Sequence, residues 1–179
     1  YFQAIANYRD RKKKIEVLDG PDGTVTEIDK MLKVAEHYYK ELFKEEERSG
    51  IALGNDFWLE SEKLDESEKE DLERKFTEEE VWQAVNESYS GGAPGPDGLS
   101  FLFYQKFWQV VKSDLMEMFD VFHKGDLNLF RLNYAMISLI PKEEGARTMK
   151  KFRPISLLNC SFKIFSKVFT TRLSKVCQR

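Results

Sequence analysis

The chain has 179 residues, 41% of them apolar, which is enough to bury one hydrophobic core and to carry an appendage. Its two cysteines fit no CxxC motif or disulfide framework, and its two histidines lie far from both, so the composition disfavours a zinc site and favours a reducing compartment. No apolar run approaches the roughly 20 residues of a membrane-spanning helix, so no membrane partner is expected. The first residue is Tyr1 rather than Met and no signal peptide follows, so we expect the N-terminus to be a cut.

The charge of the chain is unevenly distributed, although its net value is only −3. Residues 1–80 contain 14 Lys/Arg against 23 Asp/Glu, whereas residues 81–179 contain 14 against 8. Residues 145–179 contain nine basic residues and no acidic residue. This asymmetry predicts that an anionic partner meets the C-terminal part, and the alternative is a solvated surface.

The N-terminal segment predicts a small β-hairpin that is followed by an amphipathic helix. A basic cluster at residues 11–14 precedes two β-favouring runs, residues 15–18 and 24–26, which flank turn-forming residues. A helix over residues 28–44 is expected to bury the stripe Ile28, Leu32, Ala35, Tyr39 and Leu42. Residues 49–57 contain two glycines and predict a loop.

The acidic segment over residues 60–80 predicts a solvated helix with flanking linker, and it is the expected domain boundary. At its end, Thr77 and Glu80 match a capping box, in which each side chain satisfies a free amide at the start of a helix. That helix should run to about Ser88. Its expected buried residues are Val81, Trp82, Val85 and Tyr89.

Two further helices are expected over residues 101–111 and 113–124, with a break near Lys112 and with Gly125 as the terminator. The first should bury Phe101, Tyr104, Phe107, Trp108 and Val111. Two strands follow, over residues 134–140 and 152–157, joined by a polar loop. A last helix from Asn159 carries the stripe Phe162, Phe165, Phe169, Leu173 and Val176, which favours a core face over a base-stacking platform.

The hairpin formed by these two strands is the first candidate site. Lys142 leaves one strand and Arg153 enters the other, and an ammonium and a guanidinium both suit a triphosphate or a phosphodiester backbone. Arg147, Lys150 and Lys151 add positive charge at the loop. On spacing alone, an ordinary exposed hairpin whose basic residues keep it soluble is the favoured alternative.

The glycine-rich loop over residues 91–98 is the second candidate site, through Gly95, Pro96, Asp97 and Gly98. Glycines permit close backbone approach and prolines stiffen the flanking turns, so the loop can lie along a sugar-phosphate strand. Its composition alone favours a rigid connector between helices. We interpret Asp97 as an Asx-turn residue rather than a metal ligand, because it has no carboxylate partner nearby in the sequence.

The last helix offers a third, weaker feature. Its basic residues flank the apolar stripe and face either phosphates or water; they are Lys163, Lys167, Arg172, Lys175 and Arg179. The basic cluster at residues 11–14 is open to the same two interpretations.

Two segments about 45 residues apart carry a resemblance to a known family. The first is Gly-Gly-Ala-Pro-Gly-Pro-Asp-Gly at residues 91–98; the second is Leu-Ile-Pro-Lys at residues 139–142 followed by Phe-Arg-Pro-Ile-Ser-Leu-Leu-Asn at residues 152–159. In this order and at this distance they resemble the opening of the reverse transcriptase of non-LTR (LINE-type) retrotransposons, closest to the plant elements. The resemblance runs from about Phe76 to Arg179.

The resemblance implies an α+β fold, mainly helical with a short β-hairpin, as an incomplete fingers subdomain of a right-hand polymerase. Residues 1–75 would be the connector between an endonuclease and the polymerase, and residues 76–179 the N-terminal part of the reverse transcriptase domain. In that family, residues at the places of Lys142 and Arg153 contact the phosphates of the incoming nucleotide. The loop at residues 95–98 and, more weakly, Lys150 and Lys151 would contact the template.

The implied partners are an RNA template, a DNA primer, deoxynucleotides and the palm and thumb of the polymerase. Polymerisation in this family requires Mg²⁺ held by carboxylates of a Phe/Tyr-x-Asp-Asp turn and by an earlier Asp. No Asp-Asp pair occurs in this chain, so we expect no catalytic residue, no metal ligand and no cofactor in it, and no activity of the chain alone. It would be a fragment, with the nucleus as its site of action after a cytoplasmic ribonucleoprotein stage.

Two alternatives stay open. One is a non-catalytic nucleic-acid-binding remnant. The other is a decay product whose stripe Phe162, Phe165 and Phe169 is exposed because the palm is missing.

Overall fold

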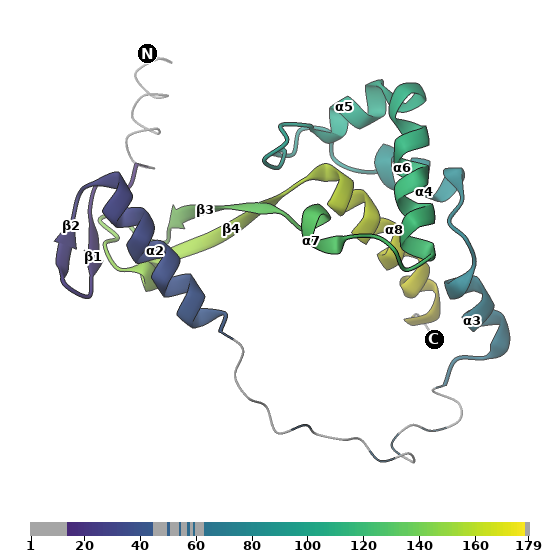
Figure 1. The fold of residues 1–179 in the computed structure, drawn as a ribbon, viewed down its shortest axis with the longest axis horizontal. Helices are drawn as coiled ribbons and strands as arrows, with labels where there is room; N and C mark the ends of the chain where they lie inside the picture. The colour runs from purple at the N-terminus through teal and green to yellow at the C-terminus, as the bar shows by residue number, and fades with distance from the viewer. Residues whose placement is uncertain are drawn as a thin grey trace. The chain divides into compact units, whose positions relative to one another are not determined.

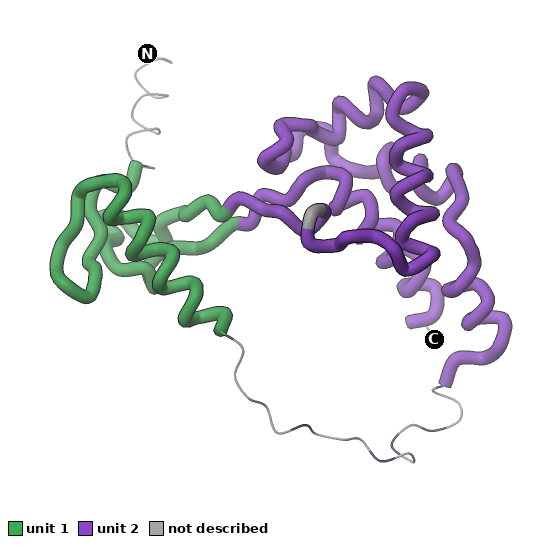
Figure 2. Tube along the Cα trace, viewed as in Figure 1, with its two compact units in different colours: residues 1–52, 137–155 green, residues 53–136, 156–179 purple. Residues whose placement is uncertain are grey.

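The computed structural model describes residues 14–44, 50, 54, 57, 59 and 63–177, which include α-helices, one 3-10 helix and two short β-sheets (Figure 1). The chain divides into two compact units: unit 1 comprises residues 1–52 and 137–155, and unit 2 comprises residues 53–136 and 156–179 (Figure 2). Residues 11–13, most of the expected loop at 49–57, and Arg179 lie outside the described residues. These units do not coincide with the two domains expected to meet at residue 75, because each unit contains residues from both. The assignment of a connector and a polymerase part stays a prediction.

Unit 1 begins with the expected hairpin. Strand β1 (Leu18–Gly20) pairs antiparallel with β2 (Gly23–Val25), so that Leu18 lies opposite Val25. The strands start later and the turn is tighter than expected, since Asp19 and Gly20 belong to β1. Gly23 has a φ of 118°, a conformation that L side chains rarely adopt, so a glycine is required where the turn enters β2.

Helix α2 (Ile28–Leu42) confirms the expected helix, but its buried face differs from the expected stripe. Ile28, Leu32 and Leu42 are 70%, 63% and 56% exposed. The residues that pack inward are Met31, Val34, Ala35, Tyr38 and Tyr39. Apolar residues cover more of the surface of α2 than the rest of unit 1 buries. The spacing of apolar residues along the helix therefore did not show which of them become buried.

The second hairpin of the chain confirms the two expected strands, β3 (Ala135–Pro141) and β4 (Phe152–Leu158). The loop between them contains the 3-10 helix η2 (Met149–Lys151). Met149 and Phe152 are buried together with Leu18 and Tyr39, and these four side chains form the core of unit 1.

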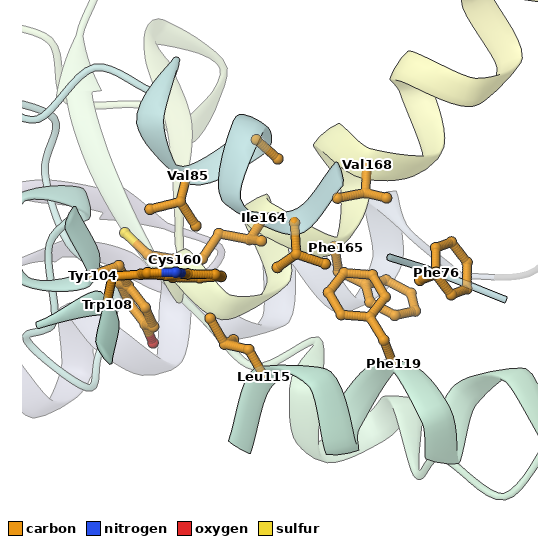
Figure 3. Close-up of a cluster of buried hydrophobic side chains, with 12 residues drawn as sticks. Phe76, Val85, Tyr104, Trp108, Leu115, Phe119, Cys160, Ile164, Phe165 and Val168 are labelled. Atoms are coloured by element: carbon orange, nitrogen blue, oxygen red, sulfur yellow. The ribbon is translucent and has the colours of Figure 1, made fainter. Parts of the chain in front are cut away.

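Unit 2 is helical. Its helices are α3 (Glu66–Glu73), α4 (Glu78–Asn86), α5 (Phe101–Lys106), α6 (Trp108–His123), α7 (Leu129–Leu132) and α8 (Cys160–Cys177). Helices α3 and α4 both pack against α8, and both begin with a capping box, at Asp65 and at the expected Thr77. Figure 3 shows the core between α4, α6 and α8. Its buried members are Phe76, Val81, Ala84, Val85, Tyr104, Trp108, Leu115, Phe119, Cys160, Ile164, Phe165 and Val168.

Three expectations about unit 2 were wrong: the position of the break between the two helices, the burial of Phe107 and the burial of Tyr89. The break between helices falls at Phe107, not Lys112, and the Phe107 side chain is 53% exposed. Tyr89 is 79% exposed, because α4 ends at Asn86 and the chain has already turned away from the core. Gly125, with a φ of 82°, follows the end of α6 as expected.

The buried face of α8 also differs from the expected stripe. Leu173 is 50% exposed, whereas Arg172 is only 5% exposed. The buried residues are Cys160, Ile164, Phe165, Val168 and Arg172. A phenylalanine stripe exposed to solvent, as expected of a decay product, does not occur in α8. Phe165 is 6% exposed and lies 5.0 Å, centroid to centroid, from Phe119.

The architecture is therefore mixed helix and strand, mainly helical, with a β3–β4 hairpin. Its assignment to a polymerase fingers subdomain stays a prediction. No helix among the described residues is long and apolar enough to cross a membrane.

Candidate nucleic-acid interface

Lys142 begins the loop of the β3–β4 hairpin, in unit 1. Its backbone amide donates to the carbonyl of Lys151 at 2.8 Å, and its Nζ donates to the carbonyl of Lys150 at 2.7 Å. An ammonium has three N–H donors, so this contact fixes the direction of the side chain and leaves two donors for a ligand. The side chain is exposed to solvent.

Arg153 lies on β4, two residues after the Lys151 that accepts from the Lys142 amide, and its side chain is exposed. In the described part of the chain, no hydrogen bond or ion pair holds its guanidinium. Lys150 is also exposed, and Lys151 forms an ion pair with Glu143. The structure thus brings Lys142, Lys150, Lys151 and Arg153 to one hairpin.

A broad, open hollow of about 790 Å³ lies beside this loop, between residues 14–17 and residues 141–147. Lys14, Lys142 and Arg147 contribute cations to its lining, and its carboxylates are Glu16, Glu143 and Glu144. Sequence reasoning had singled out Lys14 only as the end of a basic run. It did not predict that residues 14–17 lie against the hairpin loop. The local sequence before a strand does not show which distant segment packs against it.

The glycine-rich loop lies in unit 2 and is attached to the junction between β4 and α8. A Cβ added to Gly95 would lie 2.4 Å from both the backbone N and the Oδ1 of Asn159, far closer than any side-chain atom tolerates. Asn159 Oδ1 accepts a hydrogen bond from the Asp97 amide at 3.2 Å. The Lys163 ammonium donates to the carbonyl of Ala93 at 3.1 Å.

The expected Asx turn at Asp97 is confirmed, since its Oδ1 accepts a hydrogen bond from the Leu99 amide at 3.0 Å. Gly98 has a φ of 72°, and its amide donates to the carbonyl of Gly95 at 3.0 Å. Pro96 completes this turn and is half-buried. The close approach at Gly95 is thus made to the protein's own backbone, which supports the connector interpretation of this residue. Contact of the loop with a template stays a prediction.

The two candidate sites belong to different units. Within unit 2, Gly95 and Asn159 join the two sequence segments that carry the family resemblance. This contact was not predicted, because the sequence around a glycine does not show which distant residue packs against it.

Most of the basic residues of α8 have partners within the protein. Lys163 holds the glycine-rich loop, Lys167 pairs with Glu87 at 3.3 Å, and Arg172 is buried. Lys175 is exposed. The expectation that Arg172 faces phosphates or water was therefore wrong.

The Arg172 guanidinium donates to both carboxylate oxygens of Glu80, at 3.0 and 2.8 Å. Burial by itself would raise the pKa of Glu80, but hydrogen bonds from Arg172, the Thr77 amide and Arg74 outweigh it and lower the pKa to about 2. Sequence reasoning identified Glu80 as a capping residue and missed this second role. The available signal was that Arg172 continues the helical spacing of Phe165 and Val168.

No group of three His, Cys, Asp or Glu side chains among the described residues is placed to hold a metal ion. Cys160 is buried in the core of unit 2, and burial raises the pKa of its thiol. A thiol with these properties is a packing group rather than a nucleophile.

No family model matches the chain. Over 178 residues, or 98% of the chain, it is 33% identical to a protein of Xenopus laevis described as the transposon TX1 uncharacterized 149 kDa protein. The chain is thus similar in sequence to part of a transposon protein. The matched part is 14% of that relative's length, so this chain corresponds to a small part of it. The similarity to a transposon protein agrees with the resemblance carried by the two sequence segments above, while the assignment to non-LTR retrotransposons and to plant elements stays a prediction.

Proposed function

We propose that this chain is a segment of the RNA-directed DNA polymerase of a LINE-type retrotransposon. In that enzyme it contributes contacts to the template and to the phosphates of the incoming nucleotide. The observation that carries the proposal is the similarity to a transposon protein along 98% of a chain that also contains both reverse-transcriptase-like segments.

The hairpin chemistry supports the phosphate contact. Within the described part of the chain, the Lys142 ammonium keeps two donors without a partner, and the Lys150 carbonyl at 2.7 Å fixes its direction. Arg153 presents an exposed guanidinium, which can bind a phosphate through two parallel hydrogen bonds.

Nucleotidyl transfer itself belongs to the parent enzyme in this proposal. Carboxylates elsewhere in that enzyme would hold Mg²⁺, and the palm and thumb would complete the site. An RNA–DNA hybrid and deoxynucleotides are then the partners, and the nucleus is the compartment in which they meet.

A second candidate is a nucleic-acid-binding module without catalysis. The observation that favours it is that unit 2 has a closed core of its own, with Val81, Val85 and Ile164 all fully buried. A folded unit of this kind is able to bind without the remainder of a polymerase.

Binding of the full chain to a fluorescent RNA–DNA hybrid across a salt series tests the proposal. The native chain should bind without sequence preference, and its affinity should fall steeply as the salt concentration rises. Lysine and arginine side chains release counterions from the phosphate backbone when they bind, and this release is less favourable at high salt. The charge-reversed variant Lys142→Glu/Arg153→Glu should bind about tenfold more weakly, and its salt slope should fall by about two.

Lys106→Glu/Lys124→Glu is the matched control, since it makes the same charge change at two exposed positions of unit 2. It should weaken binding by less than about threefold. Equal losses in both variants would show a non-specific charge effect and overturn the site. Absence of binding by the native chain would overturn the proposed function.

A further inference from the structure

Two segments far apart in the sequence build the core of unit 1. Leu18 and Tyr39 come from the β1–β2 hairpin and α2, and they are 2% and 9% exposed. Met149 and Phe152 come from the end of the hairpin loop, and they are 5% and 3% exposed. A two-stranded hairpin is at best marginally stable by itself, so the loop depends on the N-terminal segment for its burial.

A backbone contact accompanies this packing. The amide of Asp19, in β1, donates to the carbonyl of Arg147, in the loop, at 2.9 Å. Side chains and backbone therefore both attach residues 14–44 to the loop.

The anchored part of the loop is the part that holds Lys142. Met149 is the first residue of η2, and the Lys151 amide closes this turn onto the Thr148 carbonyl at 2.9 Å. The next two carbonyls, of Lys150 and Lys151, accept the hydrogen bonds from the Nζ and the amide of Lys142. The buried Met149 side chain thus fixes the two acceptors that orient Lys142.

We propose that residues 14–44 are a folded support that positions the Lys142 ammonium for its phosphate contact, with Leu18 and Met149 as the positioning residues. The role of this ammonium rests on the proposed function. Residues 14–44 then act as part of the phosphate-binding apparatus rather than as a passive connector.

Amide hydrogen exchange of the full chain tests the physical part of the proposal. Leu18→Ala removes packing from the support side and Met149→Ala removes it from the loop side, and neither changes a charge. Each should speed exchange of the Lys142 and Lys151 amides by about tenfold or more and leave the amides of α8 unchanged. Met149→Leu conserves volume and should restore native exchange.

Val168→Ala is the matched control, because Val168 is 2% exposed in the core of unit 2. It should speed exchange in α8 and not in the hairpin loop. Leu18→Val removes less side chain and should give a smaller change in the same direction, so the test also holds if Leu18→Ala prevents unit 1 from folding. Unchanged loop exchange in Leu18→Val and Met149→Ala would overturn the proposal.

Hybrid binding by the same variants separates this proposal from the proposed function. A three- to tenfold loss of affinity in Leu18→Ala and Met149→Ala, recovered by Met149→Leu, would support the positioning role. Native affinity in both alanine variants, with weak binding by Lys142→Glu/Arg153→Glu, would overturn the positioning role alone. Native affinity in all of these variants would overturn the proposed function as well.

Discussion

Arg172 and Glu80 lie 92 residues apart in the sequence and form a two-pronged ion pair at the edge of the unit 2 core. The same guanidinium donates to the backbone carbonyls of Leu72, Arg74 and Lys75 at 3.1, 2.7 and 2.9 Å. Its central carbon lies 4.0 Å from the ring centroid of Phe76. One side chain of α8 therefore holds the whole connection between α3 and α4.

Replacing Arg172 by Met should lower the free energy of unfolding of unit 2 by about 3 to 5 kcal/mol. The substitution keeps most of the apolar stem but leaves three carbonyls and part of the Glu80 carboxylate without donors. Urea denaturation followed by circular dichroism measures the change. Lys175→Met, at an exposed position of the same helix, should change stability by less than about 0.5 kcal/mol; equal losses would show that the ion pair contributes little.

The pH dependence of stability should report Glu80. Its pKa is about 2 in the folded chain against 4.5 as the ordinary value, so between these values the unfolded chain binds more protons. The contribution of Glu80 is complete above about pH 5 and is lost as the pH falls, by about 2 kcal/mol at pH 3. The loss of stability between pH 7 and pH 3 should thus be about 2 kcal/mol smaller in Glu80→Gln than in the native chain.

Glu79→Gln serves as the control for this titration, since Glu79 is exposed in the same helical turn. The comparison isolates Glu80, because both variants remove one carboxylate from the first turn of α4. A native-like acid loss in Glu80→Gln would contradict the assignment.

Gly95→Ala should displace the glycine-rich loop from Asn159 and destabilise unit 2 by about 2 kcal/mol or more, because the new Cβ meets backbone atoms. Gly92→Ala is the matched control, since its nearest contact is 3.4 Å, to the Tyr89 carbonyl oxygen. Thermal unfolding gives the stability, and the NMR signal of the Asp97 amide reports its hydrogen bond to Asn159. An unchanged Asp97 signal in Gly95→Ala would contradict the close packing.

Tyr39→Phe should stabilise unit 1 by about 1 kcal/mol. The hydroxyl of Tyr39 is buried and has no hydrogen-bond partner among the residues that the structure describes, and burial raises the pKa of this phenol. The phenylalanine keeps the ring contacts and removes the unsatisfied group. Tyr38→Phe, at the half-buried neighbouring position, should leave the midpoint of urea denaturation unchanged; a destabilised Tyr39→Phe would show that the hydroxyl has a partner.

Features that depend on neighbours within a few residues could be predicted from the sequence alone. The capping box of Thr77 and Glu80 and the Asx turn at Asp97 form as expected, and the β1–β2 hairpin forms where it was expected, although with a tighter turn. Their hydrogen bonds join groups that are close in the chain, so the local residue types determine them. The order of the longer helices and of the strands was predictable for the same reason, whereas the short helices α7 and η2 were not expected. The resemblance to a transposon-encoded protein also came from the sequence, and the similarity to the Xenopus laevis protein supports it in part.

The tertiary structure alone decided which apolar and charged groups become buried. Ile28 and Leu173 follow helical spacing yet stay exposed, whereas Arg172 is buried because five acceptor contacts from distant residues replace its water. The same holds for the candidate sites, where Gly95 meets Asn159 and Met149 meets the N-terminal segment. Burial depends on the surface that another part of the chain supplies, and spacing along one helix or loop carries no information about that surface.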